Sequence, residues 1–246
     1  MKKLALVTGS KGGIGSAISS QLVKDGYRVI ATYSTGNYQS ALDWFGEKQF
    51  NQDQVRLFEL DVTDTAQCAD RLIQLLQEEG TLDVVVNNAG ITRDSTFKKM
   101  NASAWKDVID TNLNSVFNVT QPLFDAMCEK GNGRIINISS VNGLKGQFGQ
   151  ANYSAAKAGM IGFSKALAAE GARSGVTVNV VAPGYTGTPM VEQMKPEVLE
   201  AIKAQIPMKR LATPEEVAQS VSFLVSDAGA YITGETLSVN GGLYMH

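Results

Sequence analysis

The sequence contains very little histidine or cysteine. Its only histidine is His246, at the chain end, and its two cysteines are Cys68 and Cys128. Chain ends usually fray, so this histidine gives no basis for a Ser-His-Asp triad, a Cys-His pair or a His-ligated zinc site. Two cysteines are too few for a structural zinc cluster. We therefore expect no metal site, and an enzyme with this sequence would need Tyr, Lys or a carboxylate as its acid or base.

The sequence also lacks a large charge excess and a long hydrophobic run. Lys and Arg number 22 against 24 Asp and Glu, which argues against nucleic acid or an anionic membrane as the main partner. No apolar run approaches the roughly 20 residues that cross a bilayer. Met1-Lys2-Lys3 leads into a strand-like run rather than a signal peptide. We expect a cytoplasmic protein.

Short apolar runs alternate with longer segments in which apolar residues recur every three to four positions. Leu4–Val7 is followed by such a segment, Ile14–Val23, which predicts a strand and then an amphipathic helix. Several later runs are apolar on both faces, as in parallel strands covered by helices. This order, without repeats or linkers, predicts a doubly wound parallel α/β sheet in one domain, residues 1–246. The other strand-like runs are Arg28–Thr32, Val55–Leu60, Leu82–Val86, Arg134–Ile138, Val176–Val181 and Thr236–Val239, and long helical patterns cover Ala102–Cys128 and Ser154–Ala172.

Residues 186–210 differ from the rest of the chain. They contain Pro189, Pro196 and Pro207, many charges and no clear strand pattern. A loop-rich segment after a late strand can be a mobile lid over a site at the strand ends. We predict a substrate lid, with an ordinary surface excursion of helix and loop as the alternative.

A glycine-rich turn, Thr8 to Gly15, separates the first predicted strand from the first predicted helix. Glycine allows positive φ angles and has no Cβ to obstruct a phosphate, and the helix N-terminus adds free N–H groups. This strand–turn–helix context favours a dinucleotide pyrophosphate site over a plain turn. The Gly-Lys-Ser/Thr sequence of a phosphate-loop NTPase is absent, because Gly12 follows Lys11.

The end of the second predicted strand indicates which dinucleotide binds. An NAD site usually has an acid there for the ribose 2′-hydroxyl. Residues 31–37 contain no acid, and Asp43 is the first acid to follow. We therefore favour NADPH, with a neutral loop that discriminates poorly as the alternative. Side chains that can contact a 2′-phosphate are Ser34, Thr35, Asn37 and the cationic Lys11.

Tyr153 and Lys157 are four residues apart in a predicted helix, which puts a phenol and an ammonium on one face. A free tyrosine has a pKa of about 10 and donates its proton slowly at neutral pH, and a nearby cation lowers that pKa. Ser140 follows an apolar strand, where its hydroxyl can hold a carbonyl oxygen. Alone, a Tyr–Lys pair of this spacing is common on helices.

In combination, these motifs resemble the short-chain dehydrogenase/reductase family over essentially the whole chain. The resemblance rests on Thr8-Gly9-x-x-x-Gly13-Ile14-Gly15, Asn87-Asn88-Ala89-Gly90, Asn112, Ser140, Tyr153-x-x-x-Lys157 and Pro183-Gly184, in the family's order and spacing. It implies a Rossmann-like domain of about seven parallel strands flanked by helices, assembled as a homotetramer, and catalysis without metal or histidine. It also implies that Tyr153 donates the proton and Ser140 orients the carbonyl. Lys157 would bind the nicotinamide ribose and lower the Tyr153 pKa, and Asn112 would hold a relay water.

The cofactor contacts are expected along the same motifs. Gly12 departs from the family pattern, because many NADPH-using members have arginine there, so the 2′-phosphate must be held elsewhere. The predicted cofactor-binding residues are Gly9, Ser10, Gly12, Gly13, Ile14, Gly15, Tyr33, Ser34, Asp61, Val62, Asn88, Ala89, Gly90, Tyr153, Lys157, Pro183, Gly184 and Thr188.

Further strings resemble the family members that reduce acetoacetyl-CoA with NADPH to (R)-3-hydroxybutyryl-CoA for polyhydroxybutyrate synthesis. They are residues 88–94, 137–143, 146–153 and 240–245. The resemblance implies an acyl-CoA thioester as the substrate, and Lys195 on the predicted lid could meet a CoA phosphate. The predicted substrate-binding residues are Asp94, Ser140, Gln147, Phe148, Gln150, Tyr153 and Tyr185.

Two other functions remain as alternatives. A 3-oxoacyl-acyl-carrier-protein reductase would perform the same chemistry and would need a basic patch to dock an acidic carrier. A redox-sensing dinucleotide-binding regulator would not need the catalytic residues, yet all of them are present. A sugar-nucleotide epimerase shares the Tyr–Lys pair but normally has a larger C-terminal region. Candidates for the carrier-docking patch are Lys130, Arg134, Lys145 and Arg173.

Overall fold

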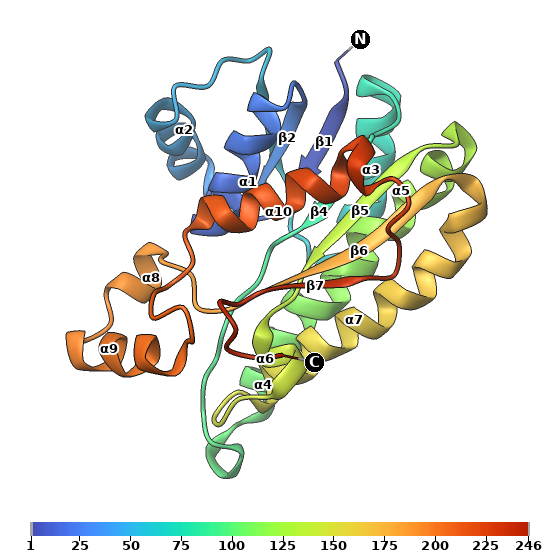
Figure 1. Ribbon diagram of the computed structural model, residues 1–246. Helices are drawn as coiled ribbons and strands as arrows, with labels where there is room; N and C mark the ends of the chain where they lie inside the picture. The colour runs from blue at the N-terminus through green and yellow to red at the C-terminus, as the bar shows by residue number, and fades with distance from the viewer. Residues whose placement is uncertain (1, 246) are drawn as a thin grey trace.

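A computed structural model describes residues 2–245, so Met1 and His246 lie outside the described residues. Within them, seven parallel strands form one sheet in the order β3-β2-β1-β4-β5-β6-β7 (Figure 1). The strands are β1 (Leu4–Val7), β2 (Arg28–Tyr33), β3 (Val55–Glu59), β4 (Val84–Asn87), β5 (Gly133–Ile138), β6 (Val176–Pro183) and β7 (Thr236–Val239). This confirms the predicted doubly wound α/β fold.

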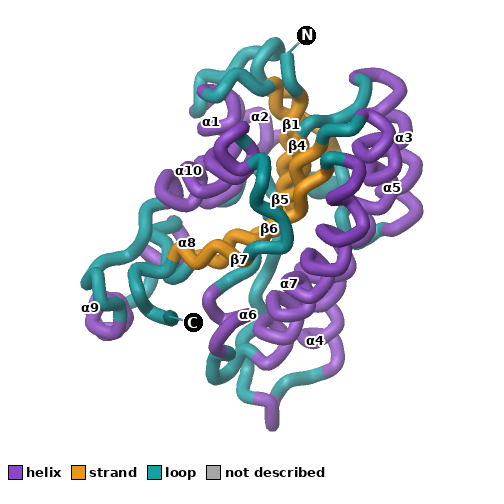
Figure 2. The backbone as a smooth tube through the Cα atoms, turned by 45° about the vertical axis from the view of Figure 1, so that its right-hand side comes forward, coloured by secondary structure: helices purple, strands orange, loops and turns teal. Residues whose placement is uncertain are grey.

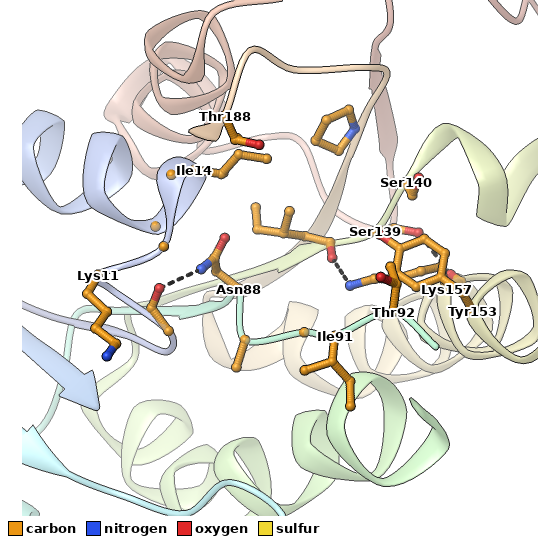
Figure 3. A pocket seen from close by; sticks show the side chains of 18 of the residues that line it. Lys11, Ile14, Asn88, Ile91, Thr92, Ser139, Ser140, Tyr153, Lys157 and Thr188 are labelled. Atoms are coloured by element: carbon orange, nitrogen blue, oxygen red, sulfur yellow. Dashed lines mark hydrogen bonds between the residues drawn. The ribbon is translucent and has the colours of Figure 1, made fainter. Parts of the chain in front are cut away.

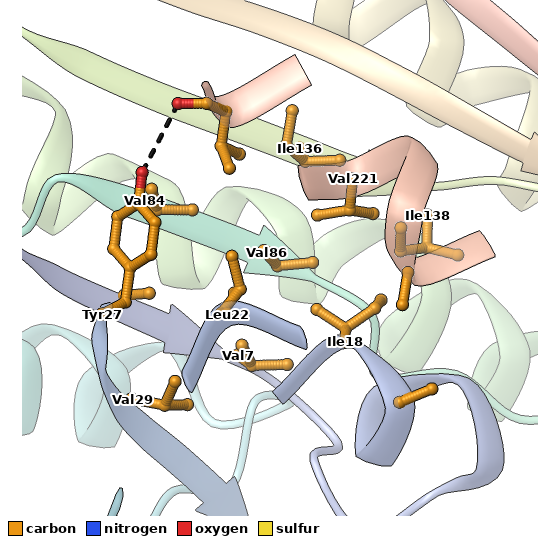
Figure 4. Packing of buried hydrophobic residues seen from close by; sticks show 14 of the residues in the cluster. Val7, Ile18, Leu22, Tyr27, Val29, Val84, Val86, Ile136, Ile138 and Val221 are labelled. Atoms are coloured by element: carbon orange, nitrogen blue, oxygen red, sulfur yellow. Dashed lines mark hydrogen bonds between the residues drawn. The ribbon is translucent and has the colours of Figure 1, made fainter. Parts of the chain in front are cut away.

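Helices cover both faces of the sheet (Figure 2). One apolar cluster joins the sheet to α1, α2 and α10, with Ile18, Leu22 and Val221 at its centre (Figure 4). The other cluster joins it to α3, α5 and α7. The longer helices are α1 (Gly13–Lys24), α2 (Tyr38–Glu47), α3 (Thr65–Glu79), α4 (Ala102–Ile109), α5 (Ser115–Lys130), α7 (Ala151–Gly171), α9 (Pro196–Gln205) and α10 (Pro214–Val225).

The shorter helical turns lie at the ends of these elements. They are α6 (Val141–Lys145), α8 (Pro189–Glu192), 3₁₀ turns at Phe97–Lys99, Ala172–Ser174 and Asp227–Gly229, and a π-helical turn at Asp110–Asn114. The π-helical turn interrupts the helix that the sequence pattern predicted over Ala102–Cys128. Among the described residues, no helix is long and apolar enough to cross a membrane.

The strand order places a crevice between β1 and β4. β1 has β2 on one side and β4 on the other, so the connections leaving this point run to opposite sides of the sheet. Open parallel sheets bind ligands at the carboxyl ends of the strands at such a switch point. The segments after β1, β4, β5 and β6 therefore meet at one edge.

Residues 186–210 leave the sheet after β6 and contain α8 and α9. The two helices project to one side of the sheet, and the segment is closed by a bridge between Thr186 and Ala212 (Figure 1). The described structure thus has two short helices in a segment that the sequence predicted to be loop-rich, with helix and loop as the alternative. The function of this segment as a lid stays a prediction.

Candidate active site

The turn between β1 and α1 has a shape that requires glycine. Gly9 has a φ of +64°, and a Cβ on Gly15 would lie 2.3 Å from the Gly9 carbonyl oxygen. A Cβ on Gly13 would lie 2.7 Å from Cγ2 of Thr188. No side chain caps the N-terminus of α1 and its first turn contains no acid, so its N–H groups suit an anionic group.

Asn88 and Thr8 lock this turn to the end of β4. The Asn88 Nδ2 donates to the carbonyl oxygens of Thr8, at 2.9 Å, and Gly9, at 3.2 Å. The Thr8 hydroxyl oxygen accepts the backbone N–H groups of Asn88 and Ala89. Asn88, the first residue after β4, thus holds the glycine-rich turn in place.

A cavity of about 730 Å³ runs from this loop to the ends of β5 and β6 (Figure 3). Its size is that of a small-molecule or cofactor site. Predicted cofactor residues that line it are Gly9, Gly12, Gly13, Ile14, Gly15, Asn88, Ala89, Gly90, Tyr153, Lys157, Pro183, Gly184 and Thr188.

Several lining residues were not predicted. Ser40, Ile91, Thr92 and Ser139 also line the cavity. The Ser40 hydroxyl accepts a hydrogen bond from Lys11 Nζ at 2.9 Å, and the Ser139 hydroxyl donates to the Lys157 carbonyl oxygen at 2.9 Å. Conversely, the predicted contacts Ser10, Tyr33, Ser34, Asp61 and Val62 are not among the lining residues.

Lys11 lies beside the turn that follows β2. Its Nζ donates to Asn37 Oδ1 at 3.4 Å as well as to Ser40, and Asn37 Nδ2 in turn donates to Ser34 Oγ at 2.9 Å. These partners are all neutral, so the positive charge of Lys11 is not neutralised by them. A cation that can bind a negatively charged group is thus available at the carboxyl end of β2.

Ser140, Tyr153 and Lys157 line the opposite end of the cavity (Figure 3). Ser140 caps α6, and its hydroxyl oxygen accepts the Asn142 backbone N–H at 3.1 Å. Tyr153 and Lys157 project from the first two turns of α7, with Lys157 Nζ 5.7 Å from the centroid of the Tyr153 ring. The Lys157 ammonium donates to the Ile138 carbonyl oxygen at 2.6 Å. A hydroxyl, a phenol and an ammonium therefore converge.

Burial shifts both titratable groups toward their neutral forms. Burial raises the pKa of Tyr153 above its usual value, a hydrogen bond with Ser140 opposes this rise, and the charge of Asp94 adds to it. Burial lowers the pKa of Lys157 to about 8. The net direction for Tyr153 is opposite to the lowering that the sequence led us to expect. At neutral pH the phenol is protonated and can act as a donor.

Asn112 lies in the π-helical turn and is fully buried. Its Oδ1 accepts the Ile91 N–H and its Nδ2 donates to the Ile91 carbonyl oxygen, both at 2.8 Å. The side chain thereby fixes the loop after β4 where it passes the cavity at Gly90. The predicted relay water at Asn112 stays a prediction.

The predicted substrate residues fall into four groups. Asp94 and Gln150 are hydrogen-bonded to each other, and Gln147 accepts a hydrogen bond from Lys145. Phe148 is 85% exposed between two glycines with positive φ, Gly146 and Gly149. Tyr185 lines a different cavity, of about 300 Å³, beneath the segment after α9. Ser140 and Tyr153 alone among them line the large cavity.

The four basic residues proposed for carrier docking do not form one patch beside this cavity. Lys130 pairs with Asp83 before β4, and Arg134 and Arg173 lie near the starts of β5 and β6. These positions are at the amino ends of the strands, opposite the carboxyl ends where the cavity opens. Only Lys145, at the end of α6, lies on the cavity side.

The cavity fits an extended nicotinamide dinucleotide. At one end a Cβ is excluded at Gly13 and Gly15 of the glycine-rich turn, and at the other end a phenol and an ammonium adjoin the Ser140 hydroxyl. This fold and site define an oxidoreductase that uses a nicotinamide dinucleotide. The family model described as enoyl-(acyl carrier protein) reductase matches residues 9–244, and the chain belongs to the short-chain dehydrogenase/reductase family.

Several curated proteins are similar to the chain over its full length. An acetoacetyl-CoA reductase of Acinetobacter sp. (strain RA3849) is 58% identical over 245 residues, which cover 100% of this chain and 99% of the relative. An acetoacetyl-CoA reductase of Allochromatium vinosum is 50% identical over 100% of both chains. The 3-oxoacyl-[acyl-carrier-protein] reductase FabG of Escherichia coli is 48% identical over 99% of this chain and 98% of its own.

Proposed function

We propose that the protein reduces acetoacetyl-CoA to (R)-3-hydroxybutyryl-CoA with NADPH. The observation that carries this proposal is the convergence of Ser140, Tyr153 and Lys157 at one end of a dinucleotide-sized cavity. The substrate is inferred from the acetoacetyl-CoA reductases that share half or more of its residues over the full chain.

A bound nicotinamide cofactor supplies the hydride for C3 of the thioester. The Ser140 hydroxyl donates a hydrogen bond to the C3 carbonyl oxygen, because its own oxygen already accepts the Asn142 N–H. The Tyr153 phenol gives its proton to that oxygen as negative charge develops there. The nearby Lys157 ammonium offsets the charge left on the phenolate.

NADPH is proposed over NADH because of the charge beside the β2 turn. Lys11 has only neutral partners there, and no acid follows β2 before Asp43. We expect Lys11→Met to raise the KM for NADPH about tenfold and to leave the KM for NADH within twofold. Equal effects on both cofactors would contradict this role of Lys11.

A CoA ester is proposed over a carrier-protein ester. A carrier is acidic and needs a basic surface near the cavity. Three of the four basic candidates lie at the opposite edge of the sheet, which removes the support the sequence gave to a docking patch. Because FabG is also similar to the chain, carrier-protein reduction is the second candidate function.

Four further properties follow from the same proposal. The enzyme would supply precursors of polyhydroxybutyrate in the cytoplasm, and it would act as a homotetramer. Residues 186–210 would close over the bound thioester, with Lys195 near a CoA phosphate. Asp61 and Val62 would meet the adenine.

Initial rates of NADPH oxidation with acetoacetyl-CoA and with acetoacetyl-carrier protein, at matched concentrations, test the substrate. We expect kcat/KM to be at least tenfold higher for the CoA ester. A tenfold advantage for the carrier protein would assign the enzyme to fatty-acid elongation instead. No oxidation with either substrate would contradict the reductase and favour a dinucleotide-binding regulator.

A further inference from the structure

A chain of hydrogen bonds connects Asp94 to the catalytic Ser140. Gln150 Nε2 donates to Asp94 Oδ2 at 2.8 Å, and Asn142 Nδ2 donates to Gln150 Oε1 at 2.9 Å. The Asn142 backbone N–H then donates to Ser140 Oγ at 3.1 Å. The chain joins the loop after β4, helix α6 and the residue before α7, so it crosses three segments that meet at Tyr153.

The carboxylate at one end sets the direction of the two side-chain bonds, whereas the backbone N–H of Asn142 donates to Ser140 in any case. An ionised carboxylate only accepts hydrogen bonds, so Gln150 must turn its NH₂ group to Asp94 and its oxygen to Asn142. Asn142 must then present its own NH₂ group. Its Oδ1 is left buried without a hydrogen-bond partner, in a residue that is 9% exposed. Reversing the Asn142 amide would place two oxygens face to face, so the unpaired acceptor persists.

The hydrogen-bonded side chains Asp94, Gln150 and Asn142 lie outside the reaction cavity. Ser140 and Tyr153 line that cavity, whereas Asp94, Gln150 and Asn142 do not. The substrate contacts that the sequence suggested for Asp94 and Gln150 stay predictions. A group that is held by protein partners and does not line the cavity acts on the reaction through its neighbours.

We propose that Asp94 is a positioning residue: through Gln150 it anchors the Asn142 side chain, which holds the first turn of α6, and the Asn142 backbone N–H in that turn holds Ser140 beside Tyr153. The inference rests on the proposed reduction for its kinetic consequences. The charge of Asp94 also acts directly on the phenol, because it contributes to the raised pKa of Tyr153. The charged group of Lys157, on the same helix, also faces the Tyr153 ring.

A double-mutant cycle separates this role from direct substrate binding. Asp94→Ala and Asn142→Ala each cut the chain at a different bond, and we expect each to lower kcat about tenfold. Because both act through one chain, the double variant loses no more than the worse single variant. Losses that multiply to about a hundredfold, or a rise in KM confined to Asp94→Ala, would overturn the proposal.

A measurement without substrate tests the electrostatic part. The Cζ resonance of Tyr153 in protein labelled with ¹³C-tyrosine, identified with Tyr153→Phe, reports its pKa. Asp94→Asn keeps an acceptor for Gln150 but removes the charge, so we expect the pKa of Tyr153 to fall. Asp107→Asn, which removes a carboxylate of the exposed Arg93 pair, is the matched control and leaves it unchanged.

The two readouts distinguish the possible failures. An unchanged pKa of Tyr153 in Asp94→Asn overturns the role of the Asp94 charge, whatever the substrate is. If acetoacetyl-CoA is not turned over by the unaltered protein, the proposed function fails, while the titration result still stands. Asp94→Asn also recovers part of the kcat lost in Asp94→Ala, and no recovery contradicts the positioning role.

Discussion

Lys157 is an ammonium group buried without a carboxylate partner among the described residues. Only 3% of it is exposed, and its hydrogen bond goes to the Ile138 carbonyl oxygen. Removal of a charge from water costs free energy, which is why burial lowers its pKa. The site therefore keeps a lysine that gains or loses its proton near neutral pH, next to a phenol that stays protonated.

This environment predicts an unusual dependence of stability on pH. The pKa of Lys157 is about 8 in the folded protein, against 10.5 for an ordinary lysine. Between these values the lysine binds more protons in the unfolded chain, so Lys157 by itself contributes a rise of roughly 2 kcal/mol in the free energy of unfolding from pH 7 to 9.5. The raised pKa of the Cys68 thiol acts in the opposite direction, so the contribution of Lys157 is the difference from a variant that lacks it. Urea unfolding at several pH values measures this. In Lys157→Met the rise should disappear, and an equal rise there would contradict the assignment to Lys157.

Removal of the Tyr153 hydroxyl should abolish chemistry without disturbing the cofactor. We expect Tyr153→Phe to lower kcat by about a thousandfold or more, because both proton donation and alkoxide stabilisation are lost. The Kd for NADPH, measured by fluorescence titration, should change less than threefold. Loss of cofactor binding together with activity would indicate structural damage instead.

At the scale of single residues, the sequence predicted the catalytic chemistry better than it predicted the contacts between side chains. Spacing on one helix was sufficient to pair Tyr153 with Lys157. It could not reveal Ser40, whose position depends on the fold bringing α2 to Lys11. Nor could it give the direction of the Tyr153 pKa shift, because burial is a property of the packed molecule.

At the scale of elements, the turn between β1 and α1 is the most constrained part of the site. A Cβ on Gly15 would meet both the Gly9 carbonyl oxygen, at 2.3 Å, and Asn88 Nδ2, at 2.5 Å. A Cβ on Gly12 would meet only the Gly9 oxygen, at an ordinary 3.4 Å. Two glycines three residues apart therefore differ in what they tolerate.

Gly15→Ala and Gly12→Ala form a matched pair. We expect Gly15→Ala to destabilise the protein by about 3 kcal/mol, because backbone must move to relieve the overlap. In a chain of this size that lowers the Tm by roughly 5–10 °C. Gly12→Ala should leave the Tm within about 2 °C. Calorimetry measures both, and equal Tm values for the two variants would contradict the overlap.

The elements themselves were largely predictable, and the exceptions have physical causes. Each strand run corresponds to a strand, because parallel strands covered on both faces must be apolar throughout. The π-helical turn at Asp110–Asn114 was missed because an amphipathic pattern cannot register a local change in hydrogen bonding. The bounds of helices α8 and α9 were not predicted, because both begin with proline, which suits the first helical position as well as a loop.

At the scale of the whole molecule, apolar side chains remain on the outer face. Trp105 on α4 is 41% exposed and Phe117 on α5 is 52% exposed. Exposed aromatic residues are typical of protein interfaces. They give the proposed homotetramer a contact surface on the helices that flank the π-helical turn.

We expect Phe117→Asp to dissociate the assembly at micromolar concentration, as measured by light scattering. Tyr38→Asp is the control, because Tyr38 is 54% exposed but its ring packs on Tyr33. It should leave the mass unchanged. If Phe117→Asp keeps the mass of the unaltered protein, this face is not the interface.

The strand order also governs how the protein emerges from the ribosome. β1 pairs with β4, and the Thr8 contacts to Asn88 span 80 residues of chain. At about 5–20 residues per second, synthesis of that stretch takes several seconds. Throughout this interval one edge of β1 is open, and an open edge strand is a template for unwanted pairing. The nascent chain is thus most vulnerable to aggregation before residue 88 leaves the exit tunnel. Chaperones should therefore bind mainly to nascent chains from which residue 88 has not yet emerged.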